Sequence, residues 1–292
     1  MDRMTQTFKT VLLLGALSAI FLLVGYALGG QGGMMVAFLI SLVMNIGSYW
    51  FSDKIVLSIH QAQEIPQDDD IYRIVRELAQ KDNLPMPKVY LVPDLAPNAF
   101  ATGRDPEHSA VCVTQGLLNI LDKEELRAVL SHEMSHVKDR DTLVCTVAAT
   151  LAAAIMDLAH MAQWIGMFGG YRDKEERRGV NPIALLFTII LAPMAATLVQ
   201  LAISRSREYL ADEEGAHLSR NPLALASALE KISNPNLMKS HQEQTELPHM
   251  QPAFSHLYIV NHFSSEAVLG LFSTHPPVAD RIKRLKGLLN NK

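Results

Sequence analysis

The stretch His132-Glu133-Met134-Ser135-His136 decides how the rest of this 292-residue sequence is interpreted. Residues four apart lie on the same face of an α-helix, so both imidazoles can reach one metal ion. Glu133 lies beside them, where its carboxylate can reach a metal-bound water. The five residues therefore predict a helix that carries two metal ligands and a general base.

The residues before the motif predict where this helix begins. Asp122 precedes a helical pattern and Glu125 follows three residues later, which is a capping-box arrangement. Apolar residues then recur at intervals of three and four, which is typical of an amphipathic helix with one buried face. They are Leu126, Val129, Leu130, Met134 and Val137. The alternative is an ordinary amphipathic helix with two hydrogen-bonded histidines.

A catalytic zinc ion normally takes three protein ligands and keeps one position open, so a third ligand must be found. The metzincin continuation would need Gly at position 139 and His at 142, but Asp139 and Thr142 stand there, which excludes that class. Further along, Glu208 and Asp212 form an E-x-x-x-D pair in a segment of helical character. Glu208 is the candidate third ligand, and Asp212 can accept the spare N–H of a ligating imidazole. The pair alone is a weak signal, because acidic pairs at this spacing are common on exposed helix faces.

Four segments together carry a resemblance to a known family. They are Asn98-Ala99-Phe100-Ala101-Thr102-Gly103, the histidine motif, Ser204-Arg205-Ser206-Arg207-Glu208 with Ala211-Asp212, and Thr274-His275-Pro276-Pro277 followed by Asp280-Arg281-Ile282. In this order and spacing the chain resembles the HtpX-type membrane metalloproteases, relatives of the CAAX prenyl endopeptidases, over nearly its full length. The resemblance implies that His132, His136 and Glu208 bind one Zn²⁺ per chain and that Glu133 is the general base.

The remaining candidate site residues concern the substrate. A donor is needed for the developing oxyanion; the candidates are Arg205, Arg207, Tyr209 and His275. His275 has an alternative role at the entry to a C-terminal helix, because Pro277 suits a first helical turn. The resemblance puts Asn98, Ala99, Phe100, Ala101 and Thr102 at the edge of the cleft, where substrate can bind as an added strand. A plain edge strand is the alternative.

The soluble part predicts an α+β domain that is mostly helical and zincin-like, of the gluzincin type. Asp68-Asp69-Asp70 opens a helix that runs to about Lys81. Short strands are expected at Lys88 to Val92, Ala99 to Thr102 and Ala110 to Thr114, because of their β-branched and aromatic content and the turn residues between them. They predict a small sheet beside the motif helix.

Long apolar blocks predict about four transmembrane helices. Val11 to Leu28 and Met34 to Phe51 are uncharged, and the second is about long enough to cross roughly 30 Å of hydrocarbon. The glycine-rich residues 29–33 between them predict a tight hairpin. Leu143 to Phe168 and Pro182 to Ile203 form a second hydrophobic hairpin, whose alternative is a shallow or interfacial position. It lies between the histidine motif and Glu208, so it accounts for the long gap between the ligands.

The domain organisation follows from these blocks. Residues 1–54 form an N-terminal transmembrane hairpin, 55–142 the first part of the protease domain, 143–203 the second hairpin, and 204–292 the second part with the third ligand. Arg3 and Lys9 before the first span, and Lys54 after the second, put both ends in the cytoplasm by the positive-inside rule. Basic residues near Arg177 oppose this orientation, because a four-span topology sends them outside. We expect a multi-pass protein of the cell inner membrane with a cytoplasmic catalytic domain.

Composition limits the possible functions. The hydrophobic content of 49% is high for a soluble protein, two cysteines cannot make a disulfide scaffold, and a net charge of −4 argues against nucleic acid as a partner. The expected partners are the lipid bilayer and protein substrates, mostly membrane proteins. The resemblance implies quality control of misfolded membrane proteins in a stress response. The alternatives are a catalytically silent membrane scaffold that retains the fold, and a prenyl-peptide processing protease, whose branch has more membrane spans than this chain can supply.

Overall fold

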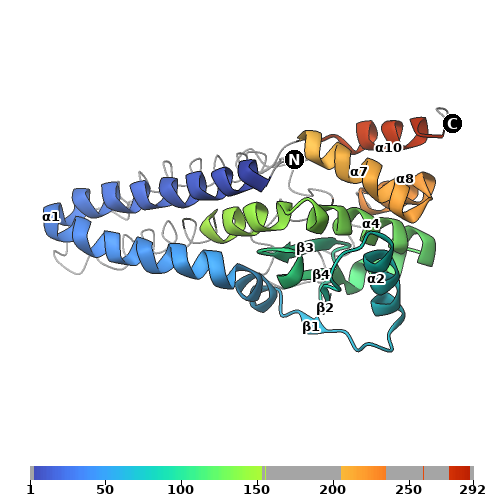
Figure 1. The fold of residues 1–292 in the computed structure, drawn as a ribbon, viewed down its shortest axis with the longest axis horizontal. Coiled ribbons are helices and arrows are strands. Elements are labelled where there is room, and N and C mark those ends of the chain that lie inside the picture. Colours follow the sequence, from blue (N-terminus) through green and yellow to red (C-terminus); the bar gives the residue numbers. More distant parts are fainter. Residues whose placement is uncertain (1–2, 153–154, 156–204, 235–258, 260–275, 290–292) are drawn as a thin grey trace, which may run out of the picture.

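The fold combines a long helical hairpin with a four-stranded sheet that is covered by helices (Figure 1). The structure is a computed structural model that describes residues 3–152, 155, 205–234, 259 and 276–289, and structural statements concern these residues. The elements are α1 (Arg3–Ile59), β1 (Gln63–Glu64), α2 (Asp70–Lys81), β2 (Lys88–Val92), β3 (Ala99–Gly103), the 3-10 turn η1 (Pro106–His108), β4 (Ser109–Thr114), α3 (Gln115–Ile120), α4 (Lys123–Lys138), α7 (Arg205–Ser219), α8 (Pro222–Ile232) and α10 (Val278–Gly287). The prediction of a mostly helical α+β protein is confirmed.

The strands lie in the order β1-β2-β4-β3. The strand β2 is parallel to β4, whereas β1 and β3 run antiparallel to their neighbours. The predicted strands are all present, with β3 one residue longer at its end and β4 one residue longer at its start than expected. Because β3 is the last strand in the order, it forms one edge of the described sheet.

Local capping explains where the helices begin. The Asp122 side chain accepts the backbone N–H groups of Glu124 and Glu125, and Glu125 accepts the N–H of Asp122, so the predicted capping box is present. The helix α2 begins one residue after its N-cap Asp69, slightly later than the first of the three predicted acids. The helix α10 begins directly after Pro277, which is its N-cap and so lies one residue before the first turn in which it was predicted.

The two faces of the sheet pack against different parts of the molecule. Because side chains alternate along a strand, Ala99 and Ala101 of β3 enter one core, while Phe100 between them enters another. The first core contains the apolar face of α4 together with residues of α2 and α8. The second contains residues of α1 and of the apolar helix Asp141–Ala152. The edge strand β3 therefore lies between the motif helix and the apolar helices.

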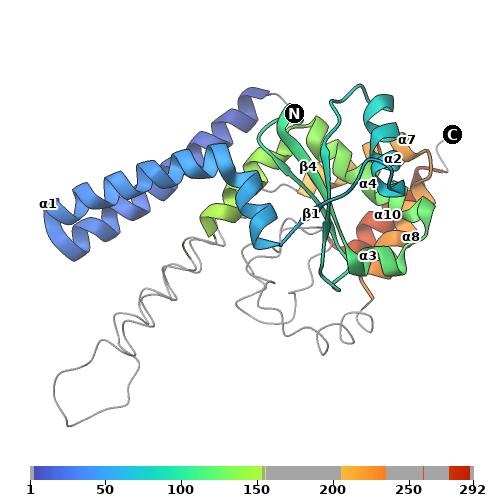
Figure 2. The same ribbon diagram turned by 90° about the horizontal axis from the view of Figure 1, so that it is seen from below.

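The long helix α1 is a tight hairpin, as predicted, with two arms side by side (Figures 1 and 2). Asn45 in the second arm donates hydrogen bonds to Ser18 Oγ at 2.8 Å and to the Leu14 carbonyl at 3.3 Å in the first. The glycine-rich connection was expected to break the helix, yet helical hydrogen bonding continues through it. Gly30 alone in this connection takes a positive φ, of 57°, so one residue in the left-handed region is enough for the chain to reverse.

The predicted spans are borne out only in part. The helix Gly30–Phe51, with mean hydropathy 1.7, is the one described segment that is long and apolar enough to cross a membrane. The first arm contains a shorter described apolar stretch, Phe8–Leu23, within the same continuous helix α1. Of the predicted second hairpin, 143–203, the structure describes residues 143–152, which belong to the apolar helix Asp141–Ala152, and residue 155, and the rest lies outside the described part of the chain.

Candidate metal centre

The two histidines of the motif lie one turn apart on α4 and present the same ring nitrogen to a common point. Their Nε2 atoms are 3.3 Å apart, and their rings meet edge to face. His132 is 1% exposed, whereas the side chain of His136 is 17% exposed, so the point between them is open on the His136 side. The i, i+4 spacing in the sequence therefore has the geometric result that was predicted from it.

The carboxylate of Glu208 on α7 completes the group. Its Oε2 lies 3.8 Å from His132 Nε2, and its Oε1 lies 3.7 Å from His136 Nε2. Suitable ligand atoms of the three side chains all lie within 4.8 Å of one another. The structure thus brings the predicted third ligand to the two histidines, although a long hydrophobic segment separates them in the sequence.

Gly215 explains how α7 can approach α4 so closely. A Cβ atom at position 215 would lie 2.8 Å from both Cα and N of His132, closer than side chains normally approach a backbone. The glycine therefore lets the two helix backbones touch at the first histidine. Glu208 is two turns earlier on α7, so this contact sets how near its carboxylate comes to the imidazoles.

The donor set and its spacing fit a zinc ion. Tetrahedral zinc with Zn–N bonds of 2.0–2.1 Å puts two ligating nitrogens about 3.3 Å apart, which is the observed separation of the Nε2 atoms. The distances from the histidine Nε2 atoms to the Glu208 oxygens are a few tenths of an ångström longer than tetrahedral zinc requires. A small rotation of the Glu208 side chain can close this difference. Two imidazoles suit zinc better than magnesium or calcium, which prefer oxygen ligands.

The outer nitrogen of His132 is held by a buried carboxylate. His132 Nδ1 lies 3.1 Å from Oδ1 of Asp212, so the structure places this aspartate beside the nitrogen whose N–H it is predicted to accept. Burial lowers the pKa of His132, which favours the neutral imidazole that a metal requires. Burial also tends to raise the pKa of Asp212, but the adjacent Arg281 guanidinium holds it well below its usual range.

Arg281 on α10 is a member of this site to which sequence reasoning assigned no role. It is fully buried and donates two hydrogen bonds to Asp212, at 2.7 and 2.8 Å, and one to the Ile259 carbonyl at 2.7 Å. Its guanidinium also lies 3.5 Å from His132 Nε2 and 3.9 Å from Glu208 Oε2. The segment Asp280-Arg281-Ile282 was noticed only as part of the resemblance, because a lone arginine in a helical pattern does not reveal its partner.

His136 has a corresponding partner in Asp141. Its Nδ1 lies 3.4 Å from Asp141 Oδ2, and Asp141 in turn accepts a 2.6 Å hydrogen bond from Arg207 Nε and forms an ion pair with the same guanidinium. Arg207 was a candidate oxyanion donor, and the structure pairs it with this aspartate. Asp141 was overlooked, although its position five residues after His136 was the available signal.

Glu133 lies next to the group, at the boundary between α4 and the edge strand. It is 4% exposed, and its carboxylate accepts the backbone N–H of Ala101 on β3. The pKa of Glu133 is raised to about 8, mainly by burial and also by the charge of Glu208, against the opposing effects of His136 and Arg281. The candidate base and the predicted substrate strand are therefore in direct contact.

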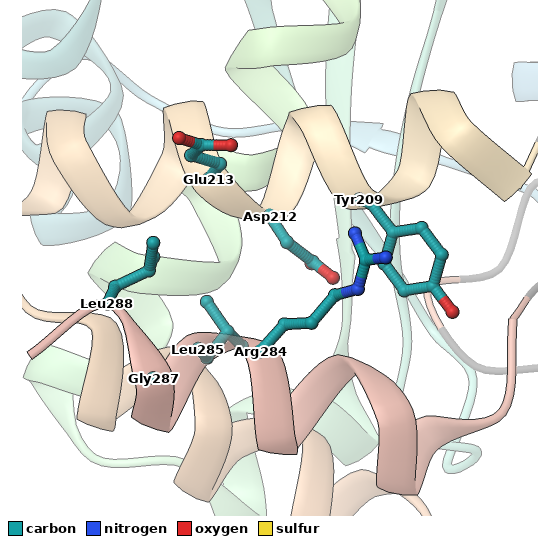
Figure 3. A pocket seen from close by; sticks show the side chains of 7 residues that line it. All are labelled: Tyr209, Asp212, Glu213, Arg284, Leu285, Gly287 and Leu288. Atoms are coloured by element: carbon teal, nitrogen blue, oxygen red, sulfur yellow. The ribbon is translucent and has the colours of Figure 1, made fainter. Parts of the chain in front are cut away.

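The other predicted residues have varied positions. The guanidinium carbon of Arg284 lies 3.8 Å from the centre of the Tyr209 ring. Both residues line a pocket of about 240 Å³ between α7 and α10, and so does Asp212 (Figure 3). Arg205 is exposed, and His275 lies outside the described residues. Asn98 is buried and accepts the backbone N–H of Ile259, while the β3 residues that follow it are buried along the whole strand.

Comparison with known proteins now adds the family. The profile of Peptidase family M48 matches residues 66–289. The chain belongs to peptidase family M48. It is 54% identical to a Protease HtpX homolog of Syntrophobacter fumaroxidans, over 98% of this chain and 100% of that protein. It is 52% identical to a Protease HtpX homolog of Pyrococcus furiosus, over 95% of this chain and 94% of that one.

Among solved structures, the crystal structure of S. mikatae Ste24p aligns with a TM-score of 0.49 at 18% identity, over 97% of this chain and 66% of that one. Family M48 and the Protease HtpX homologs make this chain a metalloprotease, hence a hydrolase that acts on peptide or protein substrates and requires a divalent metal. The candidate ligand group lies inside the matched range.

Proposed function

We propose that this M48 protein is a membrane-bound zinc endopeptidase in which His132, His136 and Glu208 bind the ion and Glu133 is the general base. One observation carries the proposal: two Nε2 atoms and a carboxylate meet at a single point, and a second carboxylate of raised pKa lies beside it. A structural zinc site would have no use for Glu133, because such sites are closed by four protein ligands.

The chemistry divides between the ion and the side chains around it. When bound, zinc lowers the pKa of a coordinated water towards 7 and polarises the scissile carbonyl. The Glu133 carboxylate would accept a proton from that water and pass it to the leaving amine. The N–H of Ala101 orients the carboxylate for this transfer.

The same contact supports a mode of substrate binding. We propose that residues 98–102 on and before β3 bind an extended substrate by adding a strand to the edge of the sheet. Since the N–H of Ala101 on this strand contacts the base, a peptide held along β3 runs close to the group of candidate ligands. This arrangement favours internal segments of a protein chain over one specific terminus.

Membrane attachment is supported by the surface of α1. Large apolar side chains along both arms are exposed, among them Leu23 and Val43 at 70% and Met35 at 63%. Such a continuous apolar surface is expected to face lipid. We propose four spans in two hairpins, 1–54 and 143–203, with the protease domain formed by 55–142 and 204–292. In this proposal the protein is a multi-pass inner-membrane protein, its catalytic domain is cytoplasmic, and it removes misfolded membrane proteins.

The test compares Glu133→Gln with Glu124→Gln, a change at an exposed carboxylate on the same helix. In purified full-length protein, we expect one zinc per chain in both variants. Peptide cleavage should fall on the order of 10²–10⁴-fold only in the first. Chelator should abolish cleavage by the wild type, and added zinc should restore it.

Two results would contradict the proposal. Wild-type cleavage by Glu133→Gln would remove this residue from the mechanism. Zinc-loaded wild-type protein that cleaves neither unfolded proteins nor prenylated peptides would favour the silent-scaffold alternative, whereas cleavage of prenylated peptides alone would favour the processing protease.

A further inference from the structure

Each of the two candidate histidine ligands has an aspartate–arginine pair next to its Nδ1 atom. Behind His132 stands Asp212, which Arg281 holds through two hydrogen bonds. Behind His136 stands Asp141, which Arg207 holds through one hydrogen bond and an ion pair. Each imidazole therefore presents Nε2 to the metal position and Nδ1 to a carboxylate that is fixed by an arginine.

The Arg207–Asp141–His136 arrangement lies where the protease domain meets the proposed second hairpin, residues 143–203. Asp141 is the first residue of the apolar helix Asp141–Ala152, after a turn in which Arg140 has a φ of 60°. Arg207 lies in the first turn of α7, directly before Glu208. The Arg207–Asp141 ion pair therefore joins the first residue of the apolar helix that leads into the proposed second hairpin to the neighbour of the third candidate ligand.

Burial gives this pair its strength. Asp141 is 3% exposed and Arg207 7%. An unpaired charge at such a position is costly, so each side chain keeps the other in place. Because the carboxylate is fixed, it can also fix which nitrogen of His136 carries the proton and how the ring is turned. His136 is the more exposed of the two histidines and so has the greater need of such support.

We infer that Asp141 and Arg207 are positioning residues of the zinc site: Asp141 orients His136, and Arg207 holds Asp141 while it ties the start of α7 to the end of α4. The inference rests on the proposed function, since it concerns how the zinc ligands are held. It also gives the proposed second hairpin a physical link to the metal, because a displacement of the apolar helix that leads into it moves the carboxylate behind His136.

The experiment measures zinc affinity by competition with a chelator, in full-length protein in detergent. Asp141→Ala should weaken zinc binding about 10–100-fold, and Asp141→Asn should weaken it less, because an amide oxygen can still accept the Nδ1 proton. In cobalt-substituted protein, both variants should shift the visible absorption bands, which report the ligand geometry. The matched control is Asp82→Asn, which removes the carboxylate that accepts a hydrogen bond from Lys138 at the end of α4. This variant should leave the zinc affinity and the cobalt spectrum unchanged.

A double variant separates positioning from folding. Asp141→Leu/Arg207→Leu replaces the buried pair by apolar side chains, an exchange that often keeps or improves stability. We expect its melting temperature to recover relative to Asp141→Ala, while its zinc affinity stays low. Recovery of zinc affinity together with stability would overturn the inference, as would wild-type affinity and an unshifted cobalt spectrum in the single variants.

The outcome also distinguishes this inference from the proposed function. If the wild type binds no zinc, the proposed function itself fails. If the wild type binds one zinc and Asp141→Asn binds it equally well with an unchanged cobalt spectrum, only the role of Asp141 and Arg207 fails. Should Asp141→Ala not fold, the Asn variant and the double variant still decide the question.

Discussion

Replacing Gly215 by alanine should damage the metal centre, although the three atoms nearest to the new methyl group all belong to the backbone of α4. The added Cβ would lie 2.8 Å from Cα and N of His132, whereas ordinary contacts begin at 3.4 Å. The difference, 3.4 − 2.8, means that the helices must separate by about 0.6 Å at this point. Both obstructing atoms belong to the backbone of a buried helix, so α7 rather than a flexible side chain has to move.

The consequences can be estimated from the distances around Glu208. The Glu208 oxygens already lie a few tenths of an ångström too far from the histidine nitrogens, so a further shift of about 0.6 Å is more than a small rotation of the side chain can close, because metal–ligand bonds tolerate only roughly 0.2 Å. We expect zinc affinity to fall at least about tenfold. Overpacking costs about 1–3 kcal/mol, which exceeds the gain of up to about 1 kcal/mol from placing alanine instead of glycine in a helix.

The matched control is Gly287→Ala in α10, where a Cβ would meet no atom of the described residues within 4 Å. The two substitutions are chemically identical, yet thermal unfolding should show a lower melting temperature for the variant at 215 and an equal or higher one for the variant at 287. Chelator competition should show weakened zinc binding at 215 only. A Gly215→Ala protein that is more stable than the wild type and binds zinc normally would refute the reasoning.

Three further outcomes are expected. Glu125→Ala removes the capping box and the hydrogen bonds to two α8 side chains, so denaturant unfolding should show a loss of about 2–3 kcal/mol; a loss below 0.5 kcal/mol would contradict this ledger of contacts. Asn45→Ala removes the hydrogen bond to Ser18 between the two arms of α1 and should cost about 0.6–1.7 kcal/mol, seen as a lower melting temperature in detergent. In metal-free protein, burial raises the pKa of Glu133 from 4.5 to about 8, so the folded state holds its proton more tightly than the unfolded state. The resulting stability is present below pH 4.5 and is lost as the pH rises through about 8, by up to about 5 kcal/mol, and Glu133→Gln should flatten this dependence in a series of melting curves.

Interactions between residues that are close in sequence made much of the fold predictable. The capping box at Asp122 and Glu125, the strand composition of 88–92 and the proline before α10 act within a few residues, so they predict element boundaries nearly to the residue. The spacing of His132 and His136 predicts a shared helix face by geometry alone. The E-x-x-x-D spacing made Glu208 only a weak candidate, and the family resemblance then assigned it as the third ligand.

The sequence by itself determined the motif helix, its capping, the apolar blocks and the kind of chemistry that two histidines and a glutamate allow, because each depends on neighbours along the chain. Only the tertiary structure decided that Arg281 and Arg207 fix the aspartates behind the two histidines, that Gly215 lets α7 touch α4, and that β3 lies between two cores. These features depend on which surfaces pack together, and a buried charge or a missing side chain acquires its meaning from the atoms that the fold brings against it.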